Sequence, residues 1–114
     1  MESLELILLF DYYGDLLTER QKTCFDMHYN QDLSLAEIAQ ELSISRQAVH
    51  DTLSRTEVLL KNMEAKTGCV RRDQSCRRAA ATIRHAASEL CAYPDAAVSA
   101  QAEKIAAAAR ELEE

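Results

Sequence analysis

Apolar and polar residues alternate most clearly in the middle of the chain. Between Ser34 and Lys66, apolar residues recur every three or four positions, as they do on helices that bury one face. The pattern breaks at residues 43–45, which separates a helix of two turns from a longer helix. The predicted inward positions are Leu35, Ile38, Ala39, Leu42, Val49, Leu53, Thr56, Leu60 and Met63.

A short helix, a three-residue turn and a longer second helix are typical of the helix-turn-helix. Ser34 with Glu37 three residues later has the sequence of a capping box, and Ser45 is placed to cap the longer helix. Ala39 is predicted to lie where the two helices approach most closely. The apolar residues predicted to lock the pair are Ile38, Leu42, Ile44 and Val49.

Two further helices are predicted before this motif. The first covers residues 2–13 and ends at Gly14. Its expected core face is Leu4, Ile7 and Leu8, with Phe10 or Asp11 beyond. The second is capped by Thr18, which with Gln21 forms another capping box, and runs to about residue 29.

The end of the chain predicts a helical hairpin. Two apolar patterns of coiled-coil type are separated by Pro94 and Asp95. Their predicted seams are Ala79, Ile83, Ala86 and Leu90, followed by Val98, Ala102, Ile105, Ala109 and Leu112. The predicted division is a helix-turn-helix domain over residues 1–66 and a C-terminal helical extension over residues 67–114.

Composition agrees with an all-α fold. The 114 residues include only 2 Gly and 1 Pro, so a β-sandwich or barrel would lack turn residues. No apolar run approaches the roughly 20 residues of a membrane-spanning helix, and no secretory signal is expected. We therefore expect a cytoplasmic protein without membrane insertion, whose four cysteines are reduced thiols.

The outward side of the longer central helix carries the candidate binding residues. Arg and Gln side chains can make paired hydrogen bonds to guanine and adenine edges. The predicted reading surface consists of Ser45, Arg46, Gln47, His50, Ser54 and Arg55. The alternative is an ordinary helix pair with a solvated polar face.

Charge complicates a nucleic-acid function. The net charge is −6, and residues 1–66 hold twelve acidic and six basic side chains. A secondary basic patch is predicted in the neutral tail, formed by Arg71, Arg72, Arg77, Arg78 and Arg84. These arginines either contact phosphates or balance acidic neighbours.

The tail is also a candidate for self-association, because DNA-binding proteins of this type often pair two reading helices. Residues 69–114 are predicted to form a homodimer contact through a face around Ala80, Ala87, Ala108 and Leu112. In the alternative, the tail folds back on its own core and the chain is a monomer.

Other chemistry has little support. Cys69, Cys76, His85 and Cys91 do not have the spacing of a common zinc site. No phosphate-binding loop, nucleophile elbow or paired-carboxylate motif is present. We expect no metal, no cofactor and no enzymatic activity.

The central motif resembles known proteins. LLTERQKTCFDMHYNQDLSLAEIAQELSISRQAV is similar to the promoter-reading C-terminal region of bacterial sigma factors. With FDYYGDLLTERQ before it and SRQAVHDTLSRTE after it, residues 4–64 resemble the YlxM family of small helix-turn-helix proteins. Ser43 departs from the pattern, since this turn position often holds Gly or Asn.

The resemblance implies a DNA-binding regulatory protein linked to the signal recognition particle, because YlxM genes lie beside those of the particle's GTPases. The alternative is an accessory module that binds the particle's RNA or GTPases and does not read DNA sequence.

Overall fold

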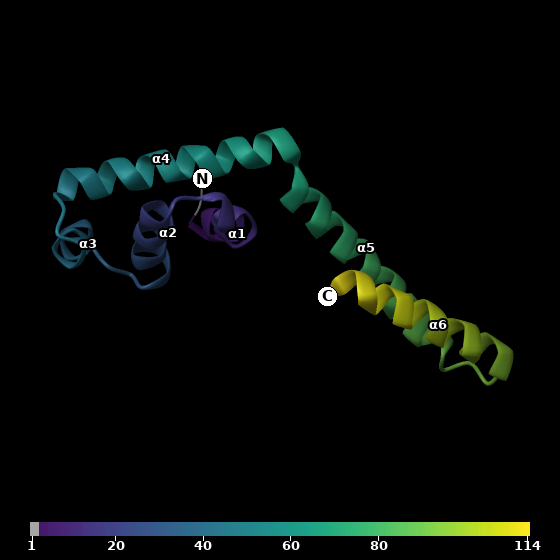
Figure 1. The fold of residues 1–114 in the computed structure, drawn as a ribbon. Helices are drawn as coiled ribbons and strands as arrows, with labels where there is room; N and C mark the ends of the chain where they lie inside the picture. The colour runs from purple at the N-terminus through teal and green to yellow at the C-terminus, as the bar shows by residue number, and fades with distance from the viewer. Residues whose placement is uncertain (1–2) are drawn as a thin grey trace. The chain divides into compact units, whose positions relative to one another are not determined.

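The computed structural model describes residues 3–114, and all regular structure in that range is helical (Figure 1). The elements are α1 (Ser3–Tyr13), η1 (Gly14–Leu16), α2 (Glu19–Phe25), η2 (Asp26–Asn30), α3 (Leu35–Leu42), α4 (Arg46–Thr67), α5 (Cys69–Leu90) and α6 (Ala96–Glu113). η1 is a 3-10 turn and η2 a π-helical turn. The predicted all-α fold is confirmed. Within residues 3–114, no helix is both long and apolar enough to cross a membrane.

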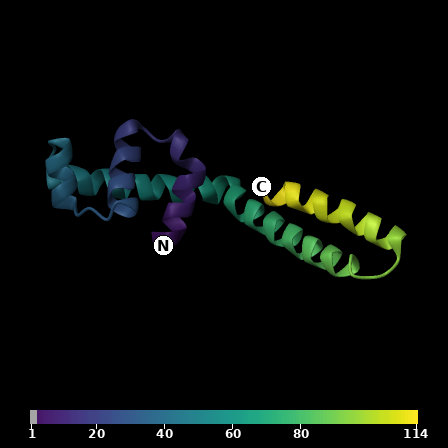
Figure 2. The same cartoon turned by 90° about the horizontal axis from the view of Figure 1, so that it is seen from below.

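The chain divides into two compact units, one through Val70 and the other comprising Arg71–Glu114. In the first unit, α1, α2 and α3 all contact α4. Figure 2 shows the three short helices arranged along the length of α4. α4 is therefore the element on which the first unit is assembled.

The predicted helix starts are confirmed. Thr18 and Gln21 form a capping box, with hydrogen bonds of 3.2 and 3.0 Å between each side chain and the other residue's backbone N–H. Ser34 and Glu37 do the same at 3.1 and 3.0 Å. The Ser45 side chain accepts a backbone N–H at 3.0 Å and caps α4. Each helix start is thus set by residues adjacent in sequence.

Contact between α3 and α4 is also as predicted. The buried side chains Cys24, Ile38, Ala39, Val49 and Leu53 form one cluster, and Leu42 and Ile44 pack against it. A second cluster joins α1, α2 and the later part of α4 and consists of Leu6, Leu9, Tyr13, Leu17, Phe25, Leu60 and Val70.

The core face predicted for the first helix was partly wrong, although Ile7 and Leu8 do pack against the core. α1 buries Leu6, Leu9 and Tyr13, whereas Leu4 is 81% exposed. Six of the seven residues from Leu4 to Phe10 are apolar, so the sequence does not single out one side. Tyr13 decides the side, because it is buried against α4 and its hydroxyl donates to Glu64 on that helix at 2.6 Å.

Gly14 follows α1 as predicted, but its role differs. It starts η1 and does not have the positive φ of a left-handed helix cap. A Cβ at this position would lie 3.4 Å from the Phe10 ring, an ordinary contact distance, so packing does not require a glycine here. Left-handed backbone ends other helices, at Ser43 (φ 56°) after α3 and at Gly68 (φ 62°) after α4.

The second unit is an antiparallel hairpin of α5 and α6, which confirms the predicted C-terminal hairpin (Figure 1). Pro94 lies in the connection. Asp95 then caps α6, because its Oδ1 accepts backbone N–H groups from Ala97 and Val98 at 2.8 and 3.2 Å.

The predicted hairpin seam was partly wrong. Alanines form the contact side, namely Ala80, Ala87, Ala102, Ala106 and Ala109, each at most 3% exposed. The larger predicted seam residues Ile83, Leu90, Val98, Ile105 and Leu112 are instead 37–54% exposed. Each helix carries a stripe of alanines beside a stripe of larger aliphatic residues. The alanines lie at the contact because their small side chains let the two helices approach closely. Of the exposed face predicted around Ala80, Ala87, Ala108 and Leu112, the first two residues are buried here and the last two are exposed.

Candidate nucleic-acid interface

The predicted reading residues lie on the first three turns of α4 and on its cap. Arg46, Gln47, His50 and Arg55 are exposed, and Ser54 is half-buried. With 100° between successive residues, these side chains lie on the arc away from the buried stripe and span about 14 Å along the helix. Ser45, the sixth of these residues, is the N-cap of the second helix of the motif.

Buried contacts hold this helix start in place. Ser43 turns the chain in the left-handed conformation, and the Ile44 N–H donates to the Ala39 carbonyl at 3.1 Å. Val49, on the side opposite the reading residues, is fully buried between α3 and α4. The reading face is therefore carried on a rigid helix pair.

A shallow hollow of about 290 Å³ lies between the starts of α3 and α4. It is lined by Leu35, Arg46, Gln47 and His50. Three of these four are predicted reading residues, so the hollow belongs to the same surface. Leu35 was assigned to the core from its spacing, and its part in this hollow was not predicted.

Asp51 also belongs to this surface. The Gln47 Nε2 donates to Asp51 Oδ1 at 2.9 Å, and His50 Nδ1 lies 3.7 Å from the same oxygen. The carboxylate therefore orients Gln47, and it adds a negative charge that repels phosphate. It can also accept a hydrogen bond from a cytosine amino group. Its position four residues after Gln47 is the sequence signal that identifies it.

Two other carboxylates on α4 bind tyrosines, which sequence reasoning missed. The Tyr29 hydroxyl donates to Glu57, and the Tyr13 hydroxyl donates to Glu64. The Val70 N–H also donates to Glu64, at 3.0 Å. The two glutamates are seven residues apart, two helical turns, which is the pattern that could have revealed them. Two of the acidic side chains of this unit, Glu57 and Glu64, thus hold its helices together.

The same contacts change the tyrosine pKa values. Burial, followed by the hydrogen bond to Glu57, raises the pKa of Tyr29 above its ordinary value of 10.0. Burial and Glu64 raise the pKa of Tyr13 in the same direction. Both hydroxyls therefore remain protonated donors over the whole neutral range.

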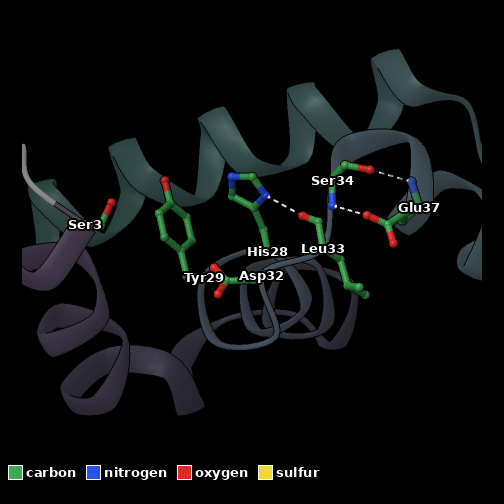
Figure 3. Close-up of a pocket in the computed structure, with 7 residues that line it drawn as sticks. All are labelled: Ser3, His28, Tyr29, Asp32, Leu33, Ser34 and Glu37. Atoms are coloured by element: carbon green, nitrogen blue, oxygen red, sulfur yellow. Dashed lines mark hydrogen bonds between the residues drawn. The ribbon is translucent and has the colours of Figure 1, made fainter.

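A second hollow, of about 420 Å³, opens beside η2 and the start of α3 (Figure 3). His28 Nδ1 lies 3.0 Å from the Leu33 carbonyl oxygen. Ser34 and Glu37 form the capping box of α3, and hydrogen bonding to Ser34 lowers the pKa of the Glu37 carboxyl. These hydrogen bonds hold the loop and the helix start, which is a structural role.

The five arginines of the predicted basic patch lie on α5 in the second unit, and two of them contact α6. Arg77 donates to Asp73 at 2.9 Å and to the Glu113 carbonyl at 2.8 Å. Arg84 pairs with the Glu113 carboxylate at 2.7 Å, which raises the arginine's pKa. Arg78 is exposed. Arg77 and Arg84 are thus held toward the C-terminal end of α6.

The four cysteines are free thiols. Cys24 is buried, and burial raises the pKa of its thiol. Across the part of the chain that the structure describes, no cluster of three or more His, Cys, Asp or Glu side chains is arranged to hold a metal ion.

Comparison with known proteins covers the helix-turn-helix and all of α5. The model of the UPF0122 family, described as "Putative helix-turn-helix protein, YlxM / p13 like", matches residues 1–92. α6 lies beyond this match.

Three relatives are bacterial UPF0122 proteins. That of Desulforamulus reducens is 57% identical over 63 residues, which are 55% of this chain and 54% of the relative. That of Clostridium kluyveri is 54% identical over 65 residues, 57% and 59% of the two chains. That of Bacillus cereus strain AH187 is 42% identical over 81 residues, 71% and 74% of the two chains. The chain thus spans only a little more than half the length of the first two relatives. The resemblance predicted from the central motif is confirmed, and the chain belongs to the UPF0122 family of YlxM/p13-like helix-turn-helix proteins.

Proposed function

We propose that this protein is a DNA-binding regulator that inserts the first turns of α4 into the major groove. The supporting observation is the exposed polar face that includes Arg46 and Gln47 at the start of α4, held by the buried α3–α4 contact. In a helix-turn-helix, these positions reach base edges. Arg46 suits guanine, and Gln47, oriented by Asp51, suits adenine.

The remaining reading residues extend this contact. Ser45 and Arg55 lie at the two ends of the face, where they can donate to backbone phosphates. His50 and Ser54 lie between them on the same side of α4. The proposed interface therefore combines base contacts at the helix start with phosphate contacts at its edges.

Acidic charge in the first unit limits non-specific binding. Residues 1–66 carry twelve acidic and only six basic side chains, so attraction to the phosphate backbone is weak. Two consequences follow for the proposal. The affinity for DNA depends on a dimer, which presents two reading helices about 34 Å apart. The α5 arginines supply the positive charge that the first unit lacks.

As the resemblance implies, the proposed regulation belongs to the signal recognition particle pathway. If the protein instead binds the particle's RNA or GTPases, no DNA sequence will be preferred over others. Selection from a random DNA library with the full chain separates the two functions at the first step.

The selected DNA then tests the reading face by fluorescence anisotropy. Replacing Arg46 and Gln47 with Ala should weaken binding at least tenfold, since each bidentate contact contributes about 1–3 kcal/mol. The control is Asn62→Ala with Lys66→Ala, which removes the same charge from exposed positions later on α4. The control should retain affinity within about threefold.

Equal losses in both double variants would show that charge alone governs binding. Enrichment of no DNA sequence, together with binding to signal recognition particle RNA or GTPases that the reading variant abolishes, would establish the alternative function.

A further inference from the structure

The hairpin leaves all its large aliphatic side chains exposed. In the described residues of α5 and α6 after Val70, every Ile, Leu and Val is at least 37% exposed. They are Ile83, Leu90, Val98, Ile105 and Leu112, and we call them the hairpin face. This is the reverse of an ordinary helical hairpin, in which the large apolar residues lie inside.

The hairpin face lies on a single side of the hairpin. Four of its members follow a buried seam alanine by three positions, as Ile83 follows Ala80 and Ile105 follows Ala102. The same offset from the seam in two antiparallel helices places side chains on the same side. The packing of Ala87 with Ala102 and Ala106, and the Arg77 contact with the Glu113 carbonyl, set the register and bring Ile83 to a level between Ile105 and Leu112.

The opposite side of the hairpin is polar. Ser88, Glu103 and Arg110 line a hollow there, together with Cys91, Ala106 and Ala107. The hairpin therefore has one polar side, an alanine seam in the middle and one uncovered apolar side. An amphipathic pair of this kind is half of a four-helix bundle.

The alanine seam makes a covering partner necessary. Ala80, Ala87, Ala102, Ala106 and Ala109 bury far less apolar surface than Leu or Ile would at the same positions. A two-helix unit with such a small core has little stability of its own. Burying the hairpin face supplies the missing core.

We propose that the hairpin face binds the same face of a second copy of this chain, forming a four-helix bundle of two hairpins. This inference specifies how the copies in the proposed function pair, and it does not depend on DNA binding. A symmetric contact uses the same patch on both copies. The seven-residue spacing of Ile83 with Leu90 and of Ile105 with Leu112 allows their side chains to interdigitate.

Charge favours a second copy over another partner. The side chains between and beside the five aliphatic residues are also uncharged, namely Ala79, Ala86, Gln101 and Ala108. This side of the hairpin therefore carries no charge over residues 79–90 of α5 and 98–112 of α6, although other sides of the same segments do. Two copies can therefore meet without like-charge repulsion. A charged peptide or a nucleic acid would find no counter-charge on this face.

The size of the face predicts a reversible dimer. From Ala79 to Leu90 it is about 17 Å long, and it is two helix diameters, about 20 Å, wide. Its projected area is about 350 Å² per copy, which is small beside the roughly 800 Å² of accessible surface that each partner buries in a standard interface. We therefore expect association in the micromolar range.

Sedimentation of the full chain tests the proposal from about 5 to 500 μM. The wild type should shift from 12.8 kDa toward twice that mass. Leu90→Lys with Ile105→Lys should remain at 12.8 kDa over the whole range. The control, Ser88→Lys with Ala107→Lys, adds the same charge to the polar side of the same helices and should dimerise like the wild type.

Hydrogen exchange of the wild type gives a second readout that does not depend on a variant folding. Protection of amides in residues 79–112 should rise with protein concentration, whereas protection in α4 should not. A wild type that stays monomeric at 500 μM, or a face variant that dimerises like the control, overturns the proposal. The DNA-reading variant of Arg46 and Gln47 should remain dimeric, so failure of DNA binding and failure of pairing are separate results.

Discussion

At the scale of single residues, two serines two positions apart in the helix-turn-helix have opposite roles. Ser43 has φ 56° and ψ 43°, a left-handed backbone that costs a non-glycine residue roughly 1–2 kcal/mol. Ser45 has φ −74° and caps α4 with its side chain. The sequence identifies Ser45 as a cap, and it marks Ser43 only as a residue other than Gly or Asn in a turn.

We predict that Ser43→Gly stabilises the first unit by about 0.5–1 kcal/mol, because glycine adopts this backbone without strain and loses part of the gain to its more flexible unfolded state. Ser45→Ala should destabilise it by about 1 kcal/mol through loss of the cap. Urea unfolding of both variants measures the two effects. If both substitutions changed the free energy of unfolding in the same direction, this turn geometry would be contradicted.

A second prediction at this scale concerns the hydrogen bond that the Tyr29 hydroxyl donates to Glu57. Tyr29→Phe removes the hydroxyl that Glu57 accepts and should cost about 1–2 kcal/mol, because a half-buried carboxylate is left without that donor. Adding Glu57→Leu should recover part of the loss, since neither group then lacks its partner. A double variant with the summed loss of both single variants would show that the two side chains are not coupled.

The sign of the pH effect follows from the raised pKa of Tyr29. Folding favours the protonated hydroxyl, so its stabilising effect is complete below pH 10.0 and is lost as the pH rises above that value toward the folded-state pKa. Tyr29→Phe should therefore reduce the fall in stability at alkaline pH. If the free energy of unfolding fell with pH equally in the wild type and in Tyr29→Phe, the pKa of Tyr29 would not change on folding.

At the scale of elements, the helix-turn-helix depends on how closely α3 crosses α4. Ala39 is 7% exposed within the cluster of Ile38 and Val49. Ala36, one turn earlier on α3, is exposed. We predict that Ala39→Leu destabilises the unit by about 1–3 kcal/mol through overpacking, while Ala36→Leu changes stability by less than about 0.5 kcal/mol. Thermal melting of the two variants compares them directly, and similar melting temperatures would contradict a close crossing at Ala39.

Helix starts could be predicted from the sequence because they depend on neighbours. Thr18 with Gln21 and Ser34 with Glu37 complete their capping boxes within four residues, so no distant contact is needed. The inward stripe of α4 was predictable for a related reason, since its apolar residues alternate with polar ones at helical spacing.

Faces were harder to predict where apolar residues surround a helix or form adjacent stripes. α1 is apolar on nearly every side, and its orientation is chosen by the distant contact of Tyr13 with α4. In α5 and α6 the alanine and aliphatic stripes are neighbours, and both fit a coiled-coil spacing. Only the three-dimensional pairing shows that the alanines lie inside. The residues of the candidate interface remain a prediction from the sequence, and the structure adds the hydrogen bond by which Asp51 orients Gln47.

At the scale of the whole molecule, the two units differ in what stabilises them. The first unit, through Val70, has large buried side chains, including Phe25, Ile38 and Leu60. The second unit, Arg71–Glu114, buries alanines and leaves its aliphatic residues exposed. A core of large side chains stabilises a single chain, whereas under the proposed pairing the alanine hairpin depends on a second copy.

We therefore predict two thermal transitions in the full chain, because only one unit depends on association. Circular dichroism at several protein concentrations should show a lower transition, from the hairpin, whose midpoint rises with concentration by mass action. The upper transition, from the helix-turn-helix unit, should not move. Ala39→Leu should lower only the upper midpoint, and Leu90→Lys with Ile105→Lys should remove the concentration dependence of the lower one. A single transition at every concentration would show that the two units unfold together, and a lower midpoint independent of concentration would show that the hairpin is stable without a partner.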